Sequence, residues 1–100
     1  MTPHLLNILI TQKADADEAS IYQYIERRFG TIYAHKFRSK LIALFSKLAQ
    51  MPTAGRAAKN DRSIRVFIFN RQNKVVYKAT ETEIIIIRIL HAKAKMSGNY

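Results

Sequence analysis

The chain of 100 residues has no cysteine, so it can form neither a disulfide nor a thiolate metal site, which fits a protein of the reducing cytosol. Its three histidines, His4, His35 and His91, match no metal-ligand spacing, so we expect neither zinc nor another cofactor. The first residues lack the basic segment and long apolar run of a secretory signal. The longest aliphatic stretch, residues 84–90, is far too short to cross a membrane. These absences predict a soluble cytoplasmic protein with no membrane partner.

Acidic residues are also scarce. The sequence has 7 Asp and Glu against 17 Lys and Arg, which gives a formal net charge of +10. Such a charge attracts polyanions, whether nucleic acid, an anionic membrane or an acidic protein. The excess is uneven, because residues 56–100 carry ten Lys and Arg against three Asp and Glu, whereas residues 1–55 carry seven against four.

Apolar residues make up 48% of the chain, which fits one domain, residues 1–100, with one core. The apolar run at residues 5–10 predicts a first strand. Thr11 is a suitable N-cap for a helix that ends before Gly30, and a second helix follows until Pro52 stops it. The connection at residues 28–31 is short, so we expect the two helices to form a hairpin that packs on a sheet.

Both predicted helices carry an apolar stripe. In the first helix Ile21, Ile25 and Phe29 recur every four residues. The stripe of the second helix consists of Tyr33, Phe37, Leu41, Leu44, Phe45 and Leu48. We expect both stripes to be buried against one face of the sheet.

Three strand-like runs follow, at residues 64–69, 75–80 and 84–91, after a segment that is predicted to be a polar loop at residues 52–62. Their connectors are too short for parallel crossovers, so the runs predict an antiparallel meander. Four consecutive isoleucines, Ile84 to Ile87, favour an internal position for the last strand. The predicted fold is α+β, with the order βααβββ and a helical hairpin packed on a small, mainly antiparallel sheet.

The order of these elements resembles the ParE/RelE toxin superfamily of bacterial type II toxin-antitoxin modules. Several segments are similar to its ParE-like plasmid stabilisation proteins, namely residues 16–21, 24–25 and 37–48, MPTAGR at 51–56, IRVF at 64–67 and IRILH at 87–91. The resemblance covers roughly residues 5–95 and depends on the order and spacing of these segments.

The resemblance implies a small toxin that is neutralised by an acidic, ParD-like antitoxin. ParE-like members inhibit DNA gyrase by binding to it, whereas RelE-like members cut messenger RNA on the ribosome as metal-independent endoribonucleases. The candidate contacts with a target or partner are Arg56, Arg65, Tyr77, Lys78, Arg88, His91, Lys93 and Lys95.

A metal-free ribonuclease needs a base, an acid and cations that stabilise the phosphorane. The catalytic candidates are Arg65, Arg88 and His91, with Tyr77 to stack on a base or relay a proton, and with Lys78 if the three strand cations converge. RelE-like nucleases usually carry a denser basic set and a Tyr or His close to the end of the last strand. This chain lacks a His–Tyr pair there and continues for nine residues past His91, which favours the ParE-like inhibitor over an enzyme.

Structural roles are the alternative for several of these residues. Arg65 and Arg88 could form salt bridges, for which Glu81 and Glu83 are available, and His91 could make a local hydrogen bond at the end of its strand. Gly55 would supply a positive φ to a turn. A plain nucleic-acid-binding module also remains open because of the net charge, although no predicted helix shows a dense basic face beside an exposed aromatic pair.

Overall fold

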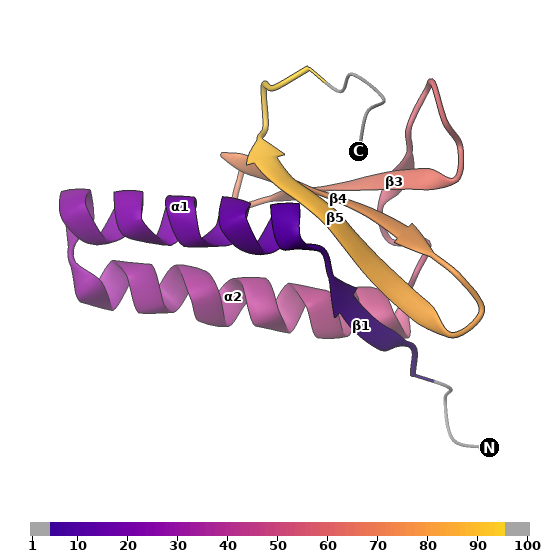
Figure 1. The fold of residues 1–100 in the computed structure, drawn as a ribbon, viewed down its shortest axis with the longest axis horizontal. Coiled ribbons are helices and arrows are strands. Elements are labelled where there is room, and N and C mark those ends of the chain that lie inside the picture. Colours follow the sequence, from indigo (N-terminus) through magenta and orange to yellow (C-terminus); the bar gives the residue numbers. More distant parts are fainter. Residues whose placement is uncertain (1–4, 96–100) are drawn as a thin grey trace.

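The computed structural model describes residues 5–95, which form an α+β fold of two helices and five strands (Figure 1). The elements are β1 (Asn7–Ile10), α1 (Gln12–Phe29), α2 (Thr31–Gln50), β2 (Arg56–Ala57), β3 (Ile64–Phe69), β4 (Asn73–Ala79) and β5 (Glu83–His91). The predicted order of one strand, two helices and three strands is confirmed. The sequence prediction missed β2, since two residues are too few to show a strand pattern.

The strands form one mixed sheet in the order β1-β5-β4-β3-β2. The meander of β3, β4 and β5 is antiparallel, as the short connectors predict, whereas β1 runs parallel to β5. β5 lies between β1 and β4, so the consecutive isoleucines do occupy an internal strand. At the sheet edge, β1 exposes the side chains of Ile8, Leu9 and Ile10.

The helical hairpin begins and turns at residues that the sequence identifies. The Thr11 hydroxyl accepts a hydrogen bond from the Ala14 amide at 3.1 Å, which caps α1, and donates to the Ile87 carbonyl at 2.9 Å, which ties the helix to β5. Gly30 alone separates the helices, and its φ of 99° is one that glycine adopts without strain. Within residues 5–95, neither helix combines the length and apolarity that a membrane crossing requires.

The core lies between α2 and the sheet. From α2 it includes Phe37, Leu41, Leu44, Phe45 and Leu48, and from β4 and β5 it includes Val75, Tyr77, Ile84, Ile86 and Ile89. Most of the predicted α2 stripe is therefore buried as expected, while Ile21 and Ile25 of α1 are partly buried against the same core.

Two members of the predicted stripes are not buried, which corrects the sequence prediction. Phe29 at the end of α1 is 57% exposed and Tyr33 at the start of α2 is 60% exposed. Figure 1 shows the reason, because the turn between the helices lies well beyond the strands. The helical periodicity continues past the sheet, and no strand is there to cover these aromatic rings.

Gly55 has a different role from the one predicted. Among the described residues, positive φ angles occur at Gly30, Asn70 and Arg71, so the chain does not need glycine at position 55 for its backbone angle. It needs the space instead. A Cβ atom on Gly55 would lie 2.6 Å from the hydroxyl oxygen of Tyr77, which is shorter than any ordinary contact.

Candidate functional site

The face of the sheet opposite the helices forms a cleft of about 750 Å³, which we call the open-face cleft. Residues two apart on a strand point to the same face of the sheet, and adjacent residues point to opposite faces. Lys78 therefore lies on the open face, whereas the adjacent Tyr77 lies on the face that packs on the helices. The floor of the cleft is apolar, whereas its rim is mainly basic, although it also includes Asp61. Its lining includes Ile64, Val66 and Ile68 of β3, Lys74 and Lys78 of β4, and Arg56, Lys59 and Ile87.

Lys74 is a residue of this cleft that the sequence analysis missed. It is only 7% exposed, lies opposite Ile68 and Leu90 on the neighbouring strands, and donates a hydrogen bond from Nζ to the Ala94 carbonyl. The chain after β5 thus folds over one end of the cleft. A signal was present in the sequence, because Lys74 and Lys78 are four residues apart and so share one face of a strand.

The structure does not bring Arg65, Lys78 and Arg88 together as a set of three cations. Arg65 lies opposite Tyr77, whereas Lys78 lies opposite Ile64 on the other face of the sheet. Arg65 donates from Nη1 to the Gly55 carbonyl at 2.7 Å. This hydrogen bond holds the guanidinium against the segment that precedes β2.

Arg88 is engaged with α1. Its Nε and Nη2 donate to the two carboxylate oxygens of Asp17 at 2.7 and 3.0 Å, and one of those oxygens also accepts from the Ile89 amide at 3.0 Å. The sequence left open whether Arg88 contacts a partner or forms a salt bridge within the chain. The structure shows a salt bridge, and its carboxylate belongs to Asp17 instead of the expected Glu81 or Glu83. A bidentate pair of this kind fixes the guanidinium plane.

Tyr77 is fully buried, so it has no exposed ring face on which a nucleic-acid base could stack. Its hydroxyl donates to the Pro52 carbonyl and accepts from the Gly55 amide, both at 2.8 Å. Burial raises the pKa of Tyr77, while the hydrogen bond from Gly55 and the charge of Arg65 lower it by a smaller amount. The residue thus fastens the loop before β2 to the core.

The raised pKa of Tyr77 predicts a loss of stability at high pH. The unfolded chain loses the phenol proton near the ordinary pKa of 10.0, whereas the folded protein keeps it to a higher pH. The stabilisation is therefore complete below about pH 10 and declines above it. Urea unfolding of the wild type and Tyr77→Phe across this range should show the wild type losing stability relative to the variant, and a constant difference would contradict the prediction.

The remaining candidate residues, Arg56, His91, Lys93 and Lys95, are all exposed. The His91 Nδ1 accepts a hydrogen bond from the Lys93 amide at 3.2 Å, which is a local contact at the end of β5. Within residues 5–95, no three His, Asp or Glu side chains gather as a metal site would require. The open-face cleft therefore offers cations around an apolar floor, an arrangement suited to an acidic segment with apolar side chains.

The family relationship decides what kind of protein carries this cleft. A family model described as the ParE toxin of the type II toxin-antitoxin system parDE matches residues 8–96. The chain belongs to the ParE toxin family. It is thus a toxin of a type II toxin-antitoxin module, and membership of the ParE family implies an antitoxin as its partner.

Solved structures agree with membership of the ParE family. A structure described as the chromosomal ParDE TA system from P. aeruginosa is 25% identical, covers 90% of this chain and 99% of its own, and superposes with a TM-score of 0.78. The conserved hypothetical protein HP0894 from Helicobacter pylori shares the fold at 16% identity, covering 88% of this chain and 96% of its own with a TM-score of 0.59. No curated protein matches the sequence.

Proposed function

We propose that this ParE family toxin acts in the cytoplasm by binding DNA gyrase and blocking its activity, without chemistry of its own. The observation that carries the proposal is the internal engagement of the two arginines that a nuclease would need. Arg65 donates to the Gly55 carbonyl and Arg88 donates to the Asp17 carboxylate, so both guanidinium groups bind partners within the chain. Binding to gyrase through exposed side chains needs neither guanidinium group to be available.

The proposed antitoxin is an acidic, ParD-like protein, and the open-face cleft suits it. The apolar floor would take apolar side chains, while Arg56 and Lys78 on the rim would pair with carboxylates. Lys93 and Lys95 lie exposed just beyond β5 and would extend the same basic surface. A topoisomerase is far larger than this chain, so an antitoxin seated here would exclude it by its bulk.

The edge strand β1 is a second place for the antitoxin. Its outer side pairs with no strand of the described residues, and Ile8, Leu9 and Ile10 are exposed there. Unpaired backbone groups beside apolar side chains favour the addition of an extended segment. We propose that part of the antitoxin adds to β1 in this way.

Purified toxin incubated with gyrase and relaxed DNA tests the function directly. We expect supercoiling to stop as toxin is added and to recover when the antitoxin follows. His91→Ala should inhibit as strongly as the wild type, because the proposal gives this imidazole no chemical step. Supercoiling that continues at full rate while messenger RNA is cut on ribosomes would overturn the proposal. A His91→Ala protein that folds and binds antitoxin but is no longer toxic would also oppose it.

A further inference from the structure

The turn between the helices carries a group of exposed apolar side chains that neither the core nor the open-face cleft uses. Phe29 and Tyr33 are more than half exposed, Tyr24 is 59% exposed and Ile32 is 71% exposed. We call this surface, formed by residues 24–36, the hairpin tip. It lies at the end of the molecule farthest from β1, as Figure 1 shows.

The aromatic rings of the hairpin tip are ordered against one another. The Phe29 and Tyr33 rings meet edge to face with centroids 6.4 Å apart, and the Lys36 Nζ lies 5.7 Å from the centroid of Tyr33. A shallow hollow beside them is lined by Tyr24 and Phe29 together with Arg27 and Arg28. Large apolar groups on one small surface mark an interaction site more often than scattered exposed residues do.

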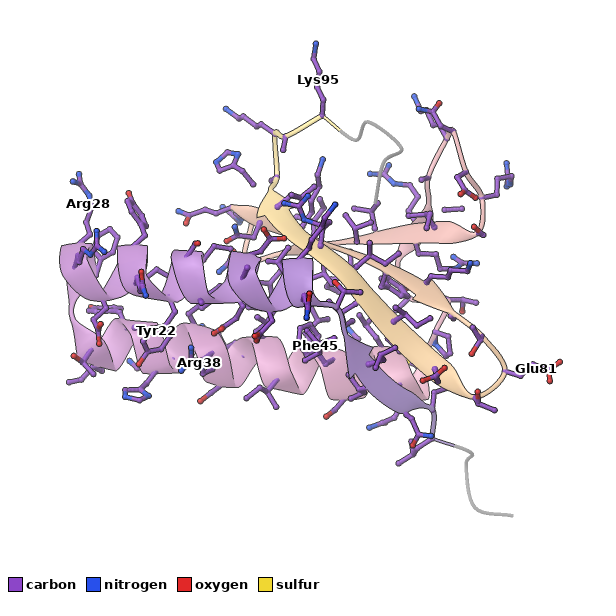
Figure 2. All side chains as sticks on the ribbon, viewed as in Figure 1. Tyr22, Arg28, Arg38, Phe45, Glu81 and Lys95 are labelled. Atoms are coloured by element: carbon purple, nitrogen blue, oxygen red, sulfur yellow. The ribbon has the colours of Figure 1, made fainter. Side chains whose placement is uncertain are left out.

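The charge of the hairpin tip is mainly positive. Residues 24–36 contain three cations, Arg27, Arg28 and Lys36, and one acid, Glu26. Figure 2 shows Arg28 at the end of α1, pointing away from α2. A surface of this kind is complementary to carboxylates placed around an apolar centre.

Side-chain contacts join the two helices that carry the hairpin tip. Closer to the sheet, Arg38 donates from Nε and Nη2 to the Glu18 carboxylate at 2.7 and 3.1 Å, which joins α2 to α1. The same guanidinium lies 3.8 Å from the centroid of the Tyr22 ring, and Figure 2 shows the two side chains together. Contacts that hold the two helices together reduce the entropy that the tip would lose when a partner binds.

From these observations we infer that the hairpin tip is the surface that binds the toxin's target, a folded protein that presents carboxylates around an apolar pocket. The inference rests on the proposed function, under which this protein is gyrase. Tyrosine and arginine are the side chains enriched where protein interfaces gain most of their affinity. Ile32 is the most exposed of the tip's apolar side chains and has no ring to stack on a base, which favours a protein over a nucleic acid. A second copy is opposed by the net charge of +10 on each chain.

Alanine variants of the hairpin tip test this inference against a matched control on the same helix. Ile32→Ala and Tyr33→Ala remove exposed side chains, so neither should disturb the fold. Ile42→Ala removes a 58% exposed isoleucine from the same helix but outside the tip. We expect each tip variant to need at least about ten-fold more toxin for half-inhibition of gyrase supercoiling, as loss of an interface hot spot would give. The control should stay within about two-fold, and all three variants should unfold at the wild-type temperature and bind antitoxin.

The outcomes separate this inference from the proposed function. If the wild type inhibits gyrase and the tip variants inhibit equally well, the hairpin tip is not the target surface although the function stands. If the wild type does not inhibit gyrase, the proposed function is wrong. The inference that the hairpin tip binds gyrase is then wrong as well. The inference is also overturned if the tip variants inhibit normally but lose salt-sensitive binding to single-stranded DNA or RNA. The inference is likewise overturned if the tip variants inhibit normally but remain monomeric under conditions in which the wild type forms a dimer.

Discussion

Replacing Tyr77 by alanine is expected to lower the free energy of unfolding by about 3–5 kcal/mol, the range for loss of a buried aromatic side chain. The ring has no exposed surface, and its removal would leave a cavity at the centre of the sheet. The change would also leave the Gly55 amide and the Pro52 carbonyl without their described partner. Urea unfolding followed by circular dichroism measures the effect.

Two further variants make the Tyr77 result specific. Tyr77→Phe keeps the ring and removes the hydroxyl, so it should cost only about 1–3 kcal/mol, the cost of an unsatisfied buried polar group. Tyr24→Ala removes an aromatic ring that is 59% exposed and should change stability by no more than about 0.5 kcal/mol. A loss below about 1 kcal/mol for Tyr77→Ala would show that this ring does not anchor the loop before β2.

Removing the carboxylate of Asp17 is expected to lower the free energy of unfolding by about 2–3 kcal/mol, as loss of charge-assisted hydrogen bonds does. Asp17→Ala would remove the two hydrogen bonds that Asp17 accepts from the Arg88 guanidinium and the one that it accepts from the Ile89 amide. The carboxylate and guanidinium are mostly buried, with side-chain exposures of 17% and 27%, so water replaces the lost contacts poorly. Urea unfolding gives the total effect, and hydrogen exchange at the Ile89 amide reports the local one.

The neighbouring residue supplies the control for Asp17. Glu18 makes the same kind of bidentate pair with Arg38, but the arginine side chain is 43% exposed and the pair lies on the helical hairpin alone. Exposed ion pairs contribute little, so Glu18→Ala should cost about 0–1 kcal/mol. Equal losses for the two variants would contradict the view that Asp17 joins α1 to β5.

The elements of the fold were predictable because each leaves a local pattern. Thr11 and Gly30 mark the ends of α1 by their chemistry, and the isoleucines from Ile84 onward mark an internal strand by their continuity. The two residues of β2 leave no period to detect. Gly55 was recognised as special for the wrong reason, since the sequence does not show that the Tyr77 hydroxyl occupies the space of its missing Cβ.

The candidate site was less predictable because it depends on contacts between distant parts of the chain. Asp17 and Arg88 are 71 residues apart, so no local pattern pairs them. Periodicity shows which side of a helix is apolar but not where the sheet ends, which is why Phe29 and Tyr33 were expected in the core. Because both rings were expected in the core, no exposed aromatic pair beside basic residues was predicted from the sequence. The structure shows such a pair at the hairpin tip.

Together these features give the toxin two separate surfaces. The open-face cleft and β1 are the proposed antitoxin side, whereas the hairpin tip at the other end is the proposed target side. Arg56 and Lys78 should therefore influence neutralisation, while Ile32 and Tyr33 should influence inhibition. Arg65, Tyr77 and Arg88 hold the structure together, by the hydrogen bonds that they make to Gly55, Pro52 and Asp17.

Co-sedimentation of the purified toxin with gyrase, in the absence of DNA and ribosomes, tests most directly whether this protein acts by contact alone. We expect a saturable complex that Tyr33→Ala weakens and that an excess of antitoxin dissociates. A toxin that stays apart from gyrase at every concentration, yet cleaves messenger RNA when ribosomes are supplied, would contradict it.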